Sequence, residues 1–241
     1  MTSTRTEQVA APDGSGEFDV TIVAPSGGTG PGVLLLQEIF GVGEFVLAKA
    51  EALALEGYVV SCPDVFWRLE RGFAVPHDET GLGAAFDRVT RWSELVDDET
   101  KAADLGAALA HLRSLPEVAG QKAAAMGYCL GGRLAYEIAV AGDPDAIVSY
   151  YGSGIADRLG DADRVTCPAL FHFGSADAFI PNDQVDAIVA AFDGRDDVTI
   201  VVQDGAGHAF ENLYAPAFAN EAAAARSWPV TLEFLDRTLL R

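Results

Sequence analysis

Short apolar runs alternate with helix-like segments along most of this 241-residue chain. The runs are nearly continuous in hydrophobicity, as in residues 32–36 (GVLLL), which is typical of strands buried on both faces. The segments between them carry apolar residues at helical spacing, as in residues 98–114. Strands that alternate with helices predict an α/β fold, in which helices cover both faces of a mostly parallel sheet. Further apolar runs lie at 58–62, 123–126, 145–151, 168–173 and 197–202.

The N-terminus departs from this pattern. Residues 1–16 are rich in Thr, Ser, Gly and Pro, and we expect a flexible lead-in there. Residues 18–24 alternate enough to predict an edge strand. No repeat, low-complexity segment or linker interrupts the rest of the chain, so residues 17–241 are predicted to form a single α/β domain.

Charge and cysteine content limit the class of protein. The formal net charge is −20, from 36 acidic against 16 basic residues, which argues against binding to nucleic acid or to anionic membranes. Residues 1–17 are polar and contain no apolar segment typical of a signal peptide, and no run approaches the ~18 apolar residues of a membrane span. Three cysteines without a close pair fit a reducing compartment. We therefore expect a soluble, cytoplasmic protein; its oligomeric state is left open, with a monomer slightly favoured.

Residues 127–132 (GYCLGG) lie between an apolar run and a helix-like segment. A strand, Gly-x-Cys-x-Gly and a helix form the pattern of a nucleophile elbow, a sharp turn that lifts one side chain above a sheet. The helix N-terminus that follows favours a thiolate and an oxyanion. A glycine-rich turn with an incidental buried cysteine is the alternative, and the hexapeptide leaves both interpretations open.

Three residues lie just past the C-terminal ends of predicted strands: Cys129, Asp177 and His208. Their order along the chain, nucleophile, acid and histidine, is that of α/β-hydrolases. A thiol must lose a proton to attack, an imidazole can take that proton, and a carboxylate holds the imidazole in the required tautomer. The ordered set predicts a catalytic triad. We interpret two other histidines as structural: His111, on a predicted helix, and His172, within a predicted strand.

The fold also predicts an oxyanion hole. Its two backbone N–H donors would come from Leu130, after the nucleophile, and from Ile39, after an earlier strand. Glu38 precedes Ile39 and is either a solvated loop residue or a buried carboxylate, which would need a partner. Arg68 and Arg71 lie beyond another strand end and are either candidate clamps for a substrate carboxylate or solvated loop residues.

Four segments resemble the signatures of the dienelactone hydrolase (carboxymethylenebutenolidase) family, and the resemblance runs from about residue 16 to the C-terminus. It implies an eight-stranded α/β-hydrolase domain without a large lid, which uses no metal and no cofactor. It also implies that a small-molecule lactone or ester is hydrolysed through an acyl-thioester on Cys129. The segments are 37–41 (QEIFG), 127–132 (GYCLGG), 173–177 (FGSAD) and 205–210 (GAGHAF).

The resemblance also bears on Glu38 and on the substrate. In that family the glutamate matching Glu38 contacts the resting thiol and helps to generate the thiolate when substrate binds, a role that we carry over as a hypothesis. The best-known members place an arginine four residues after the histidine, where it binds the substrate carboxylate. Asn212 occupies that position here and offers an amide without a charge. A neutral or differently shaped ester or lactone is therefore considered beside dienelactone.

Three functions follow from these patterns. The first is a dienelactone hydrolase-like enzyme, and the second is a general carboxylesterase or thioesterase that acts on small neutral esters with the same residues. The third is a non-catalytic ligand-binding or thiol-sensing protein. Asp177 and His208 argue against the third, and so does the absence of a resolving cysteine near Cys129.

Overall fold

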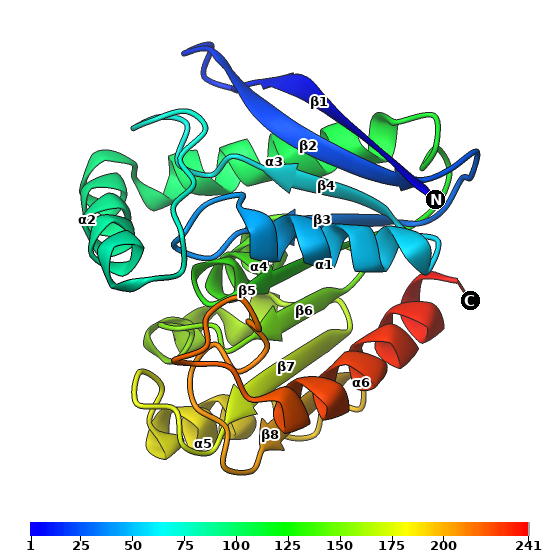
Figure 1. Ribbon diagram of the computed structural model, residues 1–241. Coiled ribbons are helices and arrows are strands. Elements are labelled where there is room, and N and C mark those ends of the chain that lie inside the picture. Colours follow the sequence, from blue (N-terminus) through cyan, green and yellow to red (C-terminus); the bar gives the residue numbers. More distant parts are fainter. Residues whose placement is uncertain (241) are drawn as a thin grey trace. The chain divides into compact units, whose positions relative to one another are not determined.

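The computed structural model describes residues 1–240, in which eight strands form one sheet in the order β1-β2-β4-β3-β5-β6-β7-β8 (Figure 1). The β3–β4 pair and the pairs from β5 to β8 are parallel, whereas β1–β2 and β2–β4 are antiparallel. Within these residues no segment forms a large separate lid. The predicted α/β-hydrolase fold is confirmed. The strands are β1 (Thr2–Ala10), β2 (Glu17–Pro25), β3 (Gly32–Leu36), β4 (Val59–Pro63), β5 (Ala123–Tyr128), β6 (Ile147–Tyr150), β7 (Ala169–Gly174) and β8 (Val198–Gln203).

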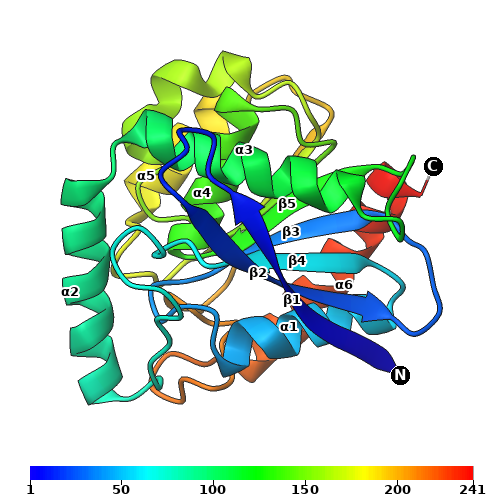
Figure 2. The same cartoon turned by 90° about the horizontal axis from the view of Figure 1, so that it is seen from above.

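The contacts of the chain cluster into two compact units, Met1–Ala124 and Ala125–Arg241. In the first unit, α1 (Glu44–Leu55) and α3 (Asp98–Ser114) lie on opposite faces of the strands (Figure 2). Every residue of β3 is buried, which explains the continuous apolar run in its sequence. Helix α2 (Glu79–Leu95) begins at the N-cap Asp78. The single domain predicted over residues 17–241 stays a prediction.

The expected flexible lead-in over residues 1–16 is wrong, because Thr2–Ala10 forms strand β1. All nine of its residues pair with β2, from Thr2 opposite Pro25 to Ala10 opposite Glu17. The β-branched residues Thr2, Thr4 and Thr6 suit a strand, but their polarity resembles that of a linker. For the same reason β2 is not the edge strand that its sequence predicted, since β1 lies outside it.

In the second unit, α4 (Leu130–Ala141) packs on β6, and α6 (Glu221–Leu239) packs on β7 (Figure 1). Helix α5 (Asn182–Ala191) contacts a 3-10 segment, η1 (Ala156–Arg164), that no sequence pattern predicted. The connections that follow β5, β7 and β8 carry Cys129, Asp177 and His208. No helix within residues 1–240 is long and apolar enough to cross a membrane.

Candidate active site

Cys129 forms the turn between β5 and α4 in the second unit. Its φ of 52° and ψ of −113° lie in a region that is costly for a residue with a side chain. The flanking glycines are required by close backbone contacts. A Cβ on Gly127 would collide with the backbone of Gly131, and a Cβ on Gly132 would lie 2.7 Å from the Tyr150 carbonyl oxygen. The sequence Gly-x-Cys-x-Gly thus folds into the predicted elbow.

Backbone hydrogen bonds hold the elbow in place. The Cys129 N–H donates to the Tyr150 carbonyl at 3.0 Å, and the Cys129 carbonyl accepts from Arg133 N–H at 3.1 Å, which starts α4. Leu130 is the first residue of that helix, so its N–H has no acceptor within the helix. The positive end of the helix dipole therefore lies directly beside Cys129.

His208 and Asp177 form a buried hydrogen-bonded pair. His208 Nδ1 donates to Asp177 Oδ2 at 2.8 Å. The other carboxylate oxygen accepts from the N–H groups of Phe179 at 2.8 Å and Ile180 at 3.1 Å. The Asp177 side chain is fully shielded from solvent. These bonds fix the carboxylate and assign the proton of Nδ1, so that the second imidazole nitrogen is left to face another group.

Cys129 completes this arrangement, because its side chain is hydrogen-bonded to His208. Burial alone would lower the pKa of His208. The negative charges of Cys129 and Asp177, together with their hydrogen bonds to the imidazole, outweigh burial and raise that pKa to about 10. The three residues therefore lie together, with the imidazole of His208 between the Cys129 side chain and the Asp177 carboxylate.

Two aromatic rings that no sequence motif singled out lie against His208. The ring centroid of Tyr151 is 5.1 Å from that of the imidazole, and the centroid of Phe179 is 5.0 Å away. Tyr151 is buried and has a φ of 39°. Within residues 1–240, three non-glycine residues have positive φ, namely Cys129, Tyr151 and Ala209, which follows His208. Backbone strain is thus concentrated at this site, as is common in functional sites.

Glu38 and Ile39 follow β3 in the first unit, and both are buried. Glu38 is 2% exposed, and its Oε1 is hydrogen-bonded to Nε2 of His77. Of the two states that the sequence allowed, the buried and paired carboxylate is the one found. The sequence did not predict a role for His77, because it lies 39 residues from Glu38 and belongs to no motif. The catalytic roles of Glu38 and Ile39 stay proposals.

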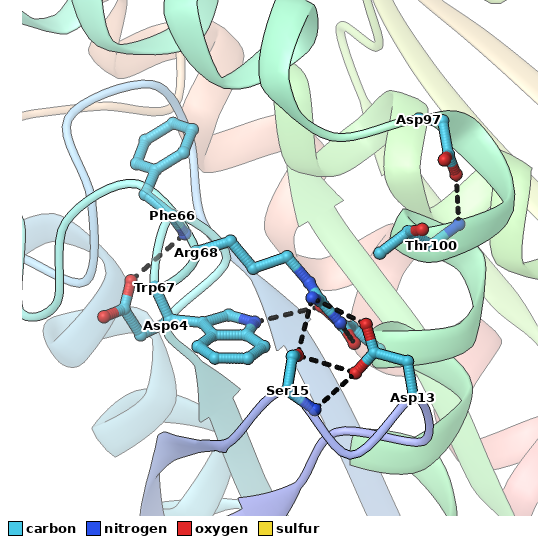
Figure 3. Close-up of polar contacts among 9 residues, drawn as sticks. Asp13, Ser15, Asp64, Phe66, Trp67, Arg68, Asp97 and Thr100 are labelled. Atoms are coloured by element: carbon cyan, nitrogen blue, oxygen red, sulfur yellow. Dashed lines mark hydrogen bonds and ion pairs between the residues drawn. The ribbon is translucent and has the colours of Figure 1, made fainter.

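Arg68 is engaged within the first unit (Figure 3). Its Nε and one terminal nitrogen donate to the two oxygens of Asp104, at 2.7 and 2.8 Å. The other terminal nitrogen donates to Asp13 at 2.9 Å and to Ser15 at 2.8 Å. Every guanidinium nitrogen thus has a partner in the protein, and the role of Arg68 as a substrate clamp stays a prediction. Arg71 is exposed, with its guanidinium 5.6 Å from the centroid of the Trp67 ring.

Asn212 lies in the turn that follows His208. Its side chain has no exposed surface, and its Oδ1 accepts from the Tyr214 N–H at 3.0 Å. Its own N–H donates to the Ala209 carbonyl at 2.9 Å. Asn212 therefore shapes the turn that follows His208, and its contact with a substrate stays a prediction.

The chain is similar to proteins of one family. The family model described as "Dienelactone hydrolase family" matches residues 18–239. A carboxymethylenebutenolidase of a Pseudomonas species is 37% identical over 225 residues, which are 93% of this chain and 92% of that protein. The carboxymethylenebutenolidase of Pseudomonas putida is 34% identical over 86% of each chain. A crystal structure of a putative dienelactone hydrolase from Klebsiella pneumoniae superposes with a TM-score of 0.81 at 25% identity, covering 96% of this chain and 98% of the other.

Proposed function

The chain belongs to the dienelactone hydrolase family and is a hydrolase of carboxylic ester or lactone bonds, and we propose that it works through an acyl-thioester on Cys129. The observation that carries this proposal is the hydrogen-bonded set of Cys129, His208 and Asp177 at a strained elbow. The non-catalytic alternative is not carried further, because the family is one of hydrolases.

In the first half of the proposed reaction, the Cys129 sulfur attacks the carbonyl carbon and the carbonyl oxygen becomes an oxyanion. The protonated His208 imidazole then gives a proton to the leaving oxygen as the C–O bond breaks, which yields the acyl-thioester and an alcohol. In a lactone the alcohol stays attached to the acyl group, because the broken bond opens a ring. Asp177 stabilises the imidazolium throughout this half-reaction.

In the second half, His208 takes a proton from water while the water oxygen attacks the thioester carbonyl. The C–S bond breaks, the carboxylic acid leaves, and Cys129 returns as a thiolate beside an imidazolium. We assign the oxyanion donors to the N–H groups of Leu130 and Ile39, each of which would contribute about 3 kcal/mol to stabilising the transition state. Glu38 is assigned to helping generate the thiolate from the resting thiol when substrate binds, before the sulfur attacks. The assignments of Ile39 and Glu38 rest on sequence resemblance.

The substrate class has two candidates. A dienelactone carries a carboxylate, yet Arg68 is paired with Asp104 and Asn212 is buried. Of the two arginines first considered as clamps, Arg71 is the exposed one. These placements favour the second candidate, a carboxylesterase that acts on small neutral esters with the same residues. A cytoplasmic location stays a proposal, based on the three free cysteines.

The proposed function is tested by replacing Cys129. We expect Cys129→Ala to abolish turnover and Cys129→Ser to lower kcat/KM by about 100-fold or more, because a serine proton is harder to remove than a thiol proton. Dienelactone isomers and uncharged short-chain esters should be assayed together. A preference for uncharged esters is expected, and a strong preference for dienelactone would assign carboxylate binding to an arginine such as Arg71.

Cys167 offers a matched control. It is half-buried like Cys129, but it lies before β7 and outside the triad. Burial raises the pKa of its thiol to about 11, so Cys167→Ser should leave turnover unchanged. Unchanged turnover in Cys129→Ala would overturn the proposed function.

A further inference from the structure

We propose that His77 is a positioning residue, which holds the Glu38 carboxylate in the orientation that the reaction requires. The proposal rests on the function proposed above for Glu38. It starts from the hydrogen bond between His77 Nε2 and Glu38 Oε1.

The backbone brings these two residues together from distant parts of the first unit. Gly41, three residues after Glu38, forms an antiparallel bridge with Ala74, three residues before His77. Next to this bridge, the Val75 N–H donates to the Phe40 carbonyl at 3.1 Å. Gly41 has a φ of 88°, and a Cβ there would collide with the Phe73 carbonyl, so the bridge requires glycine at this position. The Glu38–Gly41 segment and the loop that carries His77 are thereby held in register.

The His77 ring is fixed by its neighbours. Its centroid lies 4.3 Å from that of Phe40 and 6.4 Å from that of Phe45. The next residue, Asp78, caps α2 by accepting from the Gly81 N–H at 2.8 Å. The ring thus lies between aromatic contacts and a capped helix start, which limits its rotation.

Because both side chains are buried, the loss of this hydrogen bond would leave the Glu38 carboxylate without that donor. The side chains of His77 and Glu38 are only 6% and 3% exposed. A carboxylate withdrawn from water is costly unless a donor replaces the lost hydration. A proton on Nε2 supplies that donor and fixes the rotamer of Glu38. The pair lies past the C-terminal end of β3, the edge of a parallel sheet at which α/β enzymes bind ligands.

The chain contains a matched pair for comparison. His111 Nε2 lies 3.1 Å from Glu7 Oε2, also in the first unit, but the two side chains are 19% and 31% exposed. This second histidine–glutamate pair joins α3 to β1. Like the first pair, it joins an imidazole to a carboxylate, but neither residue is proposed to act in hydrolysis.

The test uses His77→Phe, which keeps an aromatic ring and removes the donor, and His77→Gln, which keeps an N–H donor. We expect His77→Phe to lower kcat/KM by about tenfold or more, and to slow alkylation of Cys129 to a similar extent, because a misplaced reacting group costs rate steeply. His77→Gln should recover most of both. If His77 acts through Glu38, adding His77→Phe to Glu38→Gln should cost less than about twofold.

His111→Phe is the control, and we expect it to leave kcat/KM and the alkylation rate unchanged. Equal losses in His77→Phe and His77→Gln would overturn the inference, and so would additive losses of His77→Phe and Glu38→Gln. Cys129→Ala is assayed in parallel. Unchanged kinetics in His77→Phe with an inactive Cys129→Ala overturn the inference alone, whereas an active Cys129→Ala overturns the proposed function and the inference with it.

Discussion

At the scale of single residues, the orientation of the His208 imidazole depends on groups other than the triad. Asp177 accepts from Nδ1 and fixes one edge of the ring, but this bond by itself does not hold the plane of the ring. Tyr151 and Phe179 pack against the ring with centroid distances of 5.1 and 5.0 Å. Tyr151 is buried, whereas Phe179 is about half exposed, so Tyr151 is the more rigid of the two. The strained backbone of Tyr151 is consistent with a ring held in place by its surroundings.

Substitutions at Tyr151 should therefore show whether packing of its ring against His208 affects catalysis in a protein that still folds. We expect Tyr151→Phe to keep kcat near the wild-type value and Tyr151→Leu to lower kcat by about tenfold or more, with little change in KM, because proton transfer needs a well-placed imidazole. Steady-state kinetics on one ester would measure both parameters, with thermal unfolding to confirm that each variant folds. The same kcat in both variants would show that the ring has no positioning role.

At the scale of elements, Arg68 links the β1–β2 hairpin to α3 through hydrogen bonds to both. The turn between β1 and β2 contains Asp13 and Ser15, which accept from one end of the guanidinium (Figure 3). Asp104 on α3 accepts from the other end and also from the Trp67 indole N–H at 3.0 Å. Asp104 is 9% exposed, so its ion pair with Arg68 should contribute more to the free energy of unfolding than the exposed contacts with Asp13 and Ser15.

Arg68→Ala should accordingly destabilise the protein, because it leaves the largely buried Asp104 carboxylate without its cation. We expect a loss of about 2 kcal/mol in unfolding free energy, less than the ~3–5 kcal/mol for a fully buried pair, because this pair keeps some contact with solvent. Urea-induced unfolding would measure it. Asp13→Asn should change stability far less, since its carboxylate lies in solvent. An increase in KM for neutral esters in Arg68→Ala, without loss of stability, would contradict a purely structural role.

At the scale of the whole molecule, acid stability depends on a buried histidine on β7. His172 is fully buried; its Nε2 lies 3.1 Å from Thr231 Oγ1, and its Nδ1 has no hydrogen-bond partner. The expectation of a structural core histidine fits this burial, although only one ring nitrogen is hydrogen-bonded. Burial lowers the pKa of His172 to about 3. Between that value and the ordinary histidine pKa of about 6.5, the unfolded chain binds a proton that the folded chain does not.

Stability should therefore fall as the pH is lowered from 6.5 towards 3, with a slope from His172 approaching 1.4 kcal/mol per pH unit. We expect His172→Gln to show a flatter slope over this window, as measured by urea unfolding at several pH values. Equal slopes for wild type and His172→Gln would show that other groups govern acid unfolding.

Local patterns in the sequence were enough to predict strands β3 to β8 and the order of the proposed triad along the chain. Each of these depends on a local pattern: an apolar run marks a buried strand, and a glycine-flanked cysteine marks the elbow. Because the carboxyl ends of parallel strands lie along one edge, residues just past them can be predicted to share a site without knowing any distance. Cys129, Asp177 and His208 are together for that reason.

The pairing of polar residues with one another could not be predicted from local sequence, because it depends on which distant segments the fold brings together. The strand character of Thr2–Ala10 depends on pairing with β2, and the burial of Asn212 depends on the turn around it. Arg68 could not be assigned to Asp104, nor Glu38 to His77, because each partner lies more than 30 residues away. A charged side chain in a loop has the same local sequence whether it meets substrate, solvent or another side chain. Its role is set by the partner that the fold brings within hydrogen-bonding distance.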